Sequence, residues 1–327
     1  MIVIVMGVAG VGKTTLGQLL AAELGWKFHE IAKGVTISNA TVQRRPVARR
    51  ERDTLNALAS LRLHWPEYLM EAGELGLYML FACTFATLLQ HPSSPLRHFI
   101  GSDLVRRALM GLAIGTTVTA IVMTPWGKQS GGHFNPAITF TFYRLGNVEF
   151  WDAFFYASAQ FSGAIGGVAL ATYVLRGAPA NQAIRYAVTA PGVYGDSGAF
   201  VGELTISLIL MTTILFVTNH KMSAPYTPYF VGTLYAVYIA FESPLSGMSM
   251  NPARTFGSAL YADYWHALWI YFVAPTLGML IAAEVFLRAR RGLPPYCAKL
   301  HHANNKRCIF HHGFLEHVIS RREQIEL

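Results

Sequence analysis

The chain has 327 residues, of which 53% are hydrophobic and only 13% are charged. Soluble domains average about 25% charged residues, so this composition argues against an ordinary cytosolic enzyme, and it excludes a disordered chain, which would be rich in charge. The net charge of +8 comes mostly from the two ends of the chain, which indicates membrane topology and attraction to anionic lipid rather than nucleic-acid binding.

The first 34 residues contain a phosphate-binding motif. Residues 2–6 are apolar and predict a buried strand, and residues 7–14 match the pattern G-x-x-x-x-G-K-[ST] ahead of a predicted helix. In such a loop the backbone amides hold phosphates, Lys13 reaches the terminal phosphates and Thr14 binds Mg²⁺. Residues 2–30 resemble the start of gluconate kinases. The candidate phosphate-loop residues are Gly7, Gly12, Lys13 and Thr14.

The rest of a nucleotide-binding domain does not follow this loop. Residues 35–66 read as a basic cytoplasmic linker whose only acids are Glu51 and Asp53, without a strand that ends in a metal-binding Asp. Domains rarely have fewer than 50 residues. We therefore interpret 1–34 as a P-loop kinase-like fragment, with a regulatory nucleotide site or a membrane-anchored phosphotransferase as the alternatives.

Six stretches without Asp, Glu, Lys or Arg come next. A helix needs about 20 apolar residues to cross a bilayer. Because a backbone in lipid must satisfy its own hydrogen bonds, such stretches become helices. The sequence therefore predicts an all-α membrane protein with six transmembrane helices. The stretches are 75–96, 108–127, 153–175, 204–220, 222–241 and 264–283.

Basic residues predict how these helices are oriented. Six crossings place both ends of the chain on one side. Residues 1–66 hold nine Lys and Arg and the stretch from Arg288 holds eight, whereas the opposite connections, 90–107 and 176–197, hold five. Because basic residues concentrate on the cytoplasmic side, we expect both termini in the cytoplasm. No organellar address is evident, so we expect a plasma (inner) membrane.

A short motif occurs twice. Residues 130–140 and 246–256 align, and each contains Asn-Pro-Ala. Asn is a strong helix N-cap and Pro suits the first helical turn, so each motif predicts a half-length helix, over 136–145 and 252–261. Three spanning helices per half predict an inverted repeat, in which both helix starts meet near the midplane. Their positive dipole ends would repel cations and protons there and attract an oxygen lone pair.

Three glutamates and one arginine accompany the motifs. Each half opens with a glutamate, Glu71 or Glu74 in the first and Glu203 in the second. Ionisable groups in membrane spans usually have a purpose, so we expect Glu71 and Glu203 to support the loops before the half-helices; the alternative is that one of the first pair is solvated at the interface. Arg254 would line the pore, or else pair only with loop carbonyl groups.

Together these residues resemble the aquaporin, or major intrinsic protein, family over about 67–288. The resemblance implies a channel domain at 67–290 with six transmembrane helices and two re-entrant half-helices. It also implies a pore for water or small neutral solutes in each subunit of a homotetramer in the lipid bilayer, with no enzymatic activity and no cofactor. The implied pore motifs are Asn135, Pro136 and Ala137, and Asn251, Pro252 and Ala253.

The resemblance leaves the solute open. Glycerol channels of the family usually carry Asp where this chain has Thr255, which favours water, as do Ala259 and Tyr271-Phe272. Ile239 removes a donor and widens the filter, which favours glycerol, urea or ammonia instead. Residues 125–129 read as an insertion that is either a plain loop extension or a gate. By motif, the four filter positions fall at Met110, Ile239, Met248 and Arg254.

The tail, 291–327, is rich in Cys and His. Thiolate and imidazole groups at short intervals can bind zinc, but this spacing matches no standard finger. We favour a cytoplasmic tail that binds lipid headgroups, with a metal site as the alternative. The candidate ligands are Cys297, His301, Cys308 and His311.

Overall fold

The computed structural model describes residues 55–312. The predicted phosphate-loop fragment, most of the basic linker and the last part of the tail lie outside the described residues. Within 55–312 every regular element is a helix and there is no strand.

Among the described residues, five helices are long and apolar enough to cross a membrane. They are α2 (Ala57–Gln90), α4 (Asp103–Met123), α7 (Phe150–Val174), α8 (Gly195–Thr218) and α12 (Leu268–Ala289). A sixth, α9 (Thr227–Phe241), has 15 residues and is therefore only about 22 Å long. It is shorter than the predicted stretch 222–241 because the turn η3 (Ala224–Tyr226) occupies the first residues. Each of the six predicted crossings thus corresponds to one helix.

Small residues let these six helices pack closely in pairs. The pairs are α2 with α7, α4 with α9 and α8 with α12. A Cβ atom built at Gly163 of α7 would lie 2.1 Å from the carbonyl oxygen of Ala72 in α2. One built at Gly115 of α4 would lie 2.3 Å from the carbonyl oxygen of Gly232 in α9. In lipid, where apolar side chains gain little from burial, such backbone approach is a main source of helix association.

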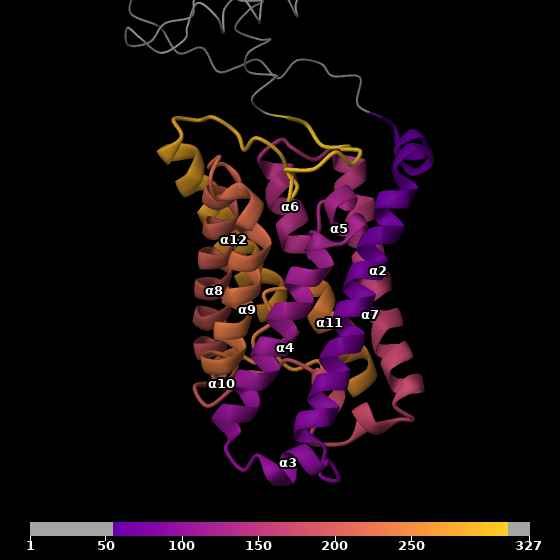
Figure 1. Ribbon diagram of the computed structural model, residues 1–327. Coiled ribbons are helices and arrows are strands. Elements are labelled where there is room, and N and C mark those ends of the chain that lie inside the picture. Colours follow the sequence, from indigo (N-terminus) through magenta and orange to yellow (C-terminus); the bar gives the residue numbers. More distant parts are fainter. Residues whose placement is uncertain (1–54, 313–327) are drawn as a thin grey trace, which may run out of the picture. The chain divides into compact units, whose positions relative to one another are not determined.

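Two half-length helices lie between the long ones. The first, α6 (Pro136–Arg144), and the second, α11 (Pro252–Ala262), begin where the Asn-Pro-Ala motifs predict. Each follows a one-turn helix, α5 (Pro125–Ser130) or α10 (Ser243–Ser246). Figure 1 shows α5 near the end of the bundle crossed by the tail and α10 near the opposite end, so the half-helices enter from opposite ends. The predicted insertion 125–129 is α5, which Thr124 caps.

The remaining short elements lie in the connections. They are α3 (Pro95–Phe99), η1 (Ala178–Ala180) and η2 (Arg185–Ala187). After α12 the chain has no regular helix up to residue 312 and runs back across the bundle end where α2 starts (Figure 1). Arg307 Nη2 donates to the carbonyl oxygen of Leu63 at 2.9 Å there. Both ends of the described chain therefore share one end of the bundle, as an even number of crossings requires. We call this the tail end.

Candidate functional site

The two motif asparagines meet inside the bundle and brace each other. Asn135 Nδ2 donates to the carbonyl oxygen of Met250, and Asn251 Nδ2 donates to the carbonyl oxygen of Phe134, both at 2.7 Å. Each Oδ1 caps its own half-helix, accepting the backbone N–H of Ala137 at 2.9 Å or of Ala253 at 3.1 Å. An amide nitrogen has two hydrogens, so each Nδ2 keeps one donor for a third partner.

A buried glutamate holds the loop before each half-helix. In the first half, Glu71 accepts the backbone N–H groups of His133 (3.0 Å) and Phe134 (2.6 Å). In the second, Glu203 accepts those of Ser249 and Met250, both at 2.7 Å. Inside a membrane, the polar groups of irregular backbone must find hydrogen-bond partners within the protein. Glu71 and Glu203 accept these backbone N–H groups at equivalent positions of the repeat.

The first half uses a second glutamate as well. Glu74 accepts the hydroxyl of Ser130 at 2.9 Å, whereas in the second half Glu203 alone accepts the equivalent hydroxyl, that of Ser246, at 2.8 Å. Glu71 and Glu74 are 0% and 1% exposed. Neither is solvated at the interface, so the structure does not support that alternative.

Two tyrosines complete the internal symmetry. Tyr156 of α7 donates to the carbonyl oxygen of Ser130 at 2.7 Å, and Tyr271 of α12 donates to that of Ser246 at 2.6 Å. In the sequence Tyr271 indicates only the class of solute, and nothing in its neighbourhood predicts this hydrogen bond. The aligned loops revealed the serines but not the distant side chains that contact them.

Both loops contain left-handed backbone at non-glycine residues. Phe134 has φ 29°, Met248 has φ 52° and Met250 has φ 54°. Such residues are uncommon and persist only where the surroundings impose them. Here the hydrogen bonds to the glutamates and asparagines impose this backbone conformation. As a result, the carbonyl oxygens of Phe134 and Met250 each accept a hydrogen bond from the asparagine of the opposite half.

Arg254 sits in the first turn of α11 with unused donors. Its side chain lies beside the hydroxyl of Tyr78 and the residue is 7% exposed. Its Nε and Nη1 atoms have no hydrogen-bond partner among the described residues. Buried donors are almost always satisfied, so these two atoms leave Arg254 with donors available to a ligand. No loop carbonyl accepts from these two atoms, which argues against the alternative that Arg254 only braces a loop.

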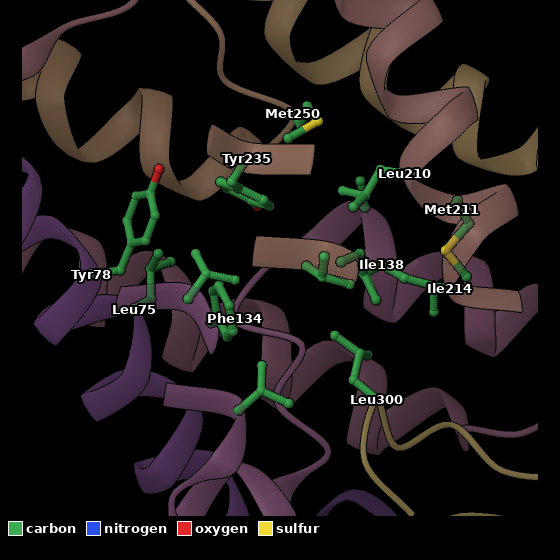
Figure 2. Packing of buried hydrophobic residues seen from close by; sticks show 14 of the residues in the cluster. Leu75, Tyr78, Phe134, Ile138, Leu210, Met211, Ile214, Tyr235, Met250 and Leu300 are labelled. Atoms are coloured by element: carbon green, nitrogen blue, oxygen red, sulfur yellow. The ribbon is translucent and has the colours of Figure 1, made fainter. Parts of the chain in front are cut away.

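The other residues assigned to a filter lie in the apolar core. Ile239 and Met248 are buried in it, and Met110 packs against it. Tyr78 and Tyr235, which the sequence did not single out, neighbour Arg254, and their rings lie 6.2 Å apart. They read as ordinary aromatic residues of apolar stretches, so no sequence signal separated them from the core. Figure 2 shows both among the buried residues around Phe134.

The tail covers the first loop from the tail end. Leu300 donates its backbone N–H to the carbonyl oxygen of Gly131 at 3.0 Å, and His133 Nε2 donates to the carbonyl oxygen of Ala298 at 2.8 Å. The ring of Phe310 stacks on that of His133 with centroids 5.4 Å apart. Figure 2 shows Leu300 among the buried residues near Ile138.

Of the four candidate metal ligands in the tail, the structure brings two together. Cys297 Sγ and Cys308 Sγ are 3.7 Å apart. The histidine that joins them is His312 rather than His301 or His311. The ring of His311 is turned the other way, toward Glu149, with Nε2 and Oε1 2.7 Å apart. Neighbouring side chains in an extended segment point to opposite sides, which spacing alone could not assign.

Comparison with known proteins agrees with this architecture. The family model described as major intrinsic protein matches residues 62–286. Aquaporin NIP2-1 of Oryza sativa subsp. japonica is 32% identical over 192 residues, which cover 57% of this chain and 61% of that protein. A PIP-type aquaporin of Atriplex canescens is 35% identical over 187 residues, covering 54% of this chain and 65% of that protein.

A solved structure shares the fold. The crystal structure of the aquaglyceroporin from Plasmodium falciparum superposes with a TM-score of 0.59 at 20% identity, covering 68% of this chain and 95% of that one. The alignments span only about three fifths of the length of the two curated relatives. Because the family model extends over most of the chain and the helical fold agrees, this chain is an integral membrane protein that belongs to the major intrinsic protein family.

Proposed function

We propose that this chain is a passive transmembrane channel for water and other small uncharged solutes that excludes ions and protons. The observation that carries the proposal is the reciprocal bracing of the two motif asparagines. Each Nδ2 gives one hydrogen to the opposite loop, at 2.7 Å, and keeps one for a passing oxygen atom.

Electrostatics supports the exclusion of ions. The half-helices α6 and α11 point their N-terminal, positive ends at the asparagines from opposite ends of the bundle. A water molecule there orients its oxygen toward both caps, and its hydrogens point away along the pore. This orientation interrupts proton hopping, and the same field repels cations. The guanidinium of Arg254 adds a positive charge and unused donors on the same path.

We also propose that conduction needs no cofactor and includes no enzymatic reaction, because passive flow of a solute makes and breaks no covalent bond. We place the protein in a plasma membrane with both termini in the cytoplasm, on the distribution of Lys and Arg. We also propose a homotetramer. The exposed aromatic surface of α7, which includes Phe150, Phe154 and Tyr173, suits contact with lipid or a neighbouring subunit.

A wider channel for glycerol, urea or ammonia is the second candidate. Ile239 carries no hydrogen-bond donor, so one wall of the assigned filter suits the carbon face of a small polyol. The Thr255 hydroxyl, which the sequence suggested as a marker for water, is buried 2.9 Å from the Thr189 hydroxyl. Thr255 therefore gives little support for ranking water above glycerol as the solute.

We assign conduction to residues 67–290 alone. A chain that lacks residues 1–54 should then conduct water at the same rate per inserted molecule, and the full chain should transfer no phosphate to gluconate. Phosphate transfer would favour the phosphotransferase alternative. Loss of flux in a shortened chain that inserts correctly would show that the phosphate-loop fragment matters for conduction.

Osmotic shrinkage of proteoliposomes tests the proposal. The measurement uses an impermeant osmolyte for water and an inward glycerol gradient for the second candidate, with a pH-sensitive dye to follow protons. We expect water flux well above that of protein-free liposomes and no added proton conductance. Permeabilities equal to those of protein-free liposomes, with correctly inserted protein, would reject both candidates. Proton conductance would reject the exclusion mechanism.

A further inference from the structure

We propose that the tail binds one zinc ion through Cys297, Cys308 and His312. One ligand atom from each of these residues lies within 4.8 Å of the other two. Zinc prefers thiolate and imidazole ligands in a tetrahedral arrangement. The three side chains come from both ends of a segment that covers the pore loop, so a bound ion would tie the two ends together.

The distance between the two sulfur atoms suits a shared ion. Cys297 Sγ and Cys308 Sγ are 3.7 Å apart. Two thiolates bound to one tetrahedral zinc at about 2.3 Å lie about 3.8 Å apart, whereas a disulfide would bring them to about 2.0 Å. The observed spacing therefore needs almost no rearrangement to accept zinc and a large one to form a disulfide.

Backbone N–H groups are placed to stabilise both sulfur atoms. The N–H of Lys299 donates to Cys297 Sγ at 3.5 Å, and the N–H of Phe310 hydrogen-bonds to Cys308. In each case the donor lies two residues after the cysteine. Donors of this kind orient metal-bound groups and hold their negative charge, so the repeated arrangement is what a thiolate site requires.

The surroundings complete the site. His312 Nδ1 is buried without a hydrogen-bond partner, and the His312 ring packs against Tyr296 at 5.7 Å between centroids. The ring of His302 packs on the same tyrosine at 5.3 Å, and its Nδ1 is also unpartnered. Cys297, Cys308 and His312 leave the fourth position of the tetrahedron to water. Two thiolates balance the charge of the ion, so the buried site carries no net charge.

The segment between Cys297 and Cys308 is held in a loop by hydrogen bonds from Lys299. The ammonium of Lys299 donates to the carbonyl oxygens of Lys306 and Arg307 at 3.3 and 2.6 Å. These two hydrogen bonds hold the start and the end of the segment close to each other, beside the sulfur atoms. A preformed loop lowers the ordering cost of binding a metal.

Elemental analysis of the full chain tests the site. The protein carries an affinity tag without histidine, is purified in detergent under reducing conditions and is dialysed against metal-free buffer. We expect about one zinc per chain, as a single tetrahedral site requires. In parallel, protein stripped with a chelator receives Co²⁺ alone, and should develop thiolate-to-cobalt charge-transfer absorption and the visible bands of tetrahedral cobalt.

Matched variants locate the ligands. His312→Gln, and Cys297→Ser with Cys308→Ser, should lose the zinc and the cobalt spectrum. His311→Gln changes the adjacent histidine, which faces Glu149, and should keep both. An unchanged metal content in the cysteine variant, absence of metal and cobalt spectrum from the unaltered protein, or loss only in His311→Gln would overturn the proposal. The cobalt titration of the unaltered protein decides the matter even if a variant fails to fold.

Discussion

At the scale of single residues, the most demanding positions are those that satisfy the irregular loops inside the bundle. Glu71 accepts two backbone N–H groups and the side-chain amide of Gln160, all within 3.0 Å. No water is available in an apolar environment to replace an acceptor. A single carboxyl group therefore determines whether the first loop can hold its shape.

Replacing that carboxyl group should destabilise the protein. In Glu71→Ala, two buried N–H groups lose their acceptor at about 1–3 kcal/mol each, so we expect the free energy of unfolding to fall by about 2–6 kcal/mol. The free energy of unfolding is measured by adding increasing amounts of SDS to the protein in mixed micelles. Glu284→Ala, on the exposed end of α12, is the matched control and should change it little. Equal stability of the two variants would contradict the role of Glu71.

We expect replacement of Arg254 to change the selectivity of the proposed channel more than the stability of the protein. The Nε and Nη1 donors of Arg254 have no hydrogen-bond partner among the described residues, and under the proposed function water or solute would accept from them. In Arg254→Ala the path widens and loses a positive charge, so we expect glycerol permeability and proton leak to rise several-fold, measured in proteoliposomes.

Arg254→Lys separates the two causes. Lysine keeps the charge but not the planar fork of donors, so proton exclusion should be retained while glycerol permeability rises. Unchanged solute and proton permeability in Arg254→Ala would show that this side chain does not line the pore.

At the scale of helices, close backbone contact holds the pairs together. Gly163 and Gly167 of α7 face Ala72 and Gly76 of α2 without room for a side chain. The carboxyl groups of Glu71 and Glu74 sit on the same stretch of α2. The spacing of α2 and α7 therefore also sets where the glutamates meet the first loop.

A methyl group on this interface should separate the helices. Gly163→Ala places a Cβ atom 2.1 Å from the Ala72 carbonyl oxygen, and overpacking of this kind costs about 1–3 kcal/mol. We expect lower unfolding stability and reduced water flux. Gly166→Ala, on the same helix with nothing within 4 Å of the added Cβ atom, should leave both nearly unchanged. A similar loss in both variants would show that the close contact at Gly163 is not its cause.

At the scale of the whole molecule, the tail and the bundle form one structure. Leu300 and Phe310 are 1% and 5% exposed, and both contact the loop that precedes α6. The carbonyl oxygen of Gly131 therefore accepts a hydrogen bond from the tail. Under the proposed function, this segment covers the mouth of the pore at the tail end.

Removing the tail should open that mouth. A chain that stops after Gly292 loses the cover on the loop, so we expect a higher water permeability per inserted molecule, measured by osmotic shrinkage with quantified protein. Phe310→Ala removes only the ring that stacks on His133 and should produce a smaller increase. Equal permeability of the full and shortened chains would mean that solutes bypass the segment.

The sequence alone determined the helical membrane fold and the two half-helices. Runs without charge predict spans because charge is excluded from lipid, and Asn-Pro-Ala predicts a helix start because capping is local. The observed starts at Pro136 and Pro252 match. Both are properties of short stretches of chain, so no tertiary information was needed.

Only the tertiary structure decided which distant groups meet. The pairing of Glu74 with Ser130, of Tyr78 with Arg254 and of Cys308 with Cys297 and His312 joins residues from separate segments. Such contacts depend on the rotation and offset of packed segments, which side-chain spacing along the chain does not fix. For the same reason, the composition of the tail could not predict that Leu300 contacts the loop that precedes α6.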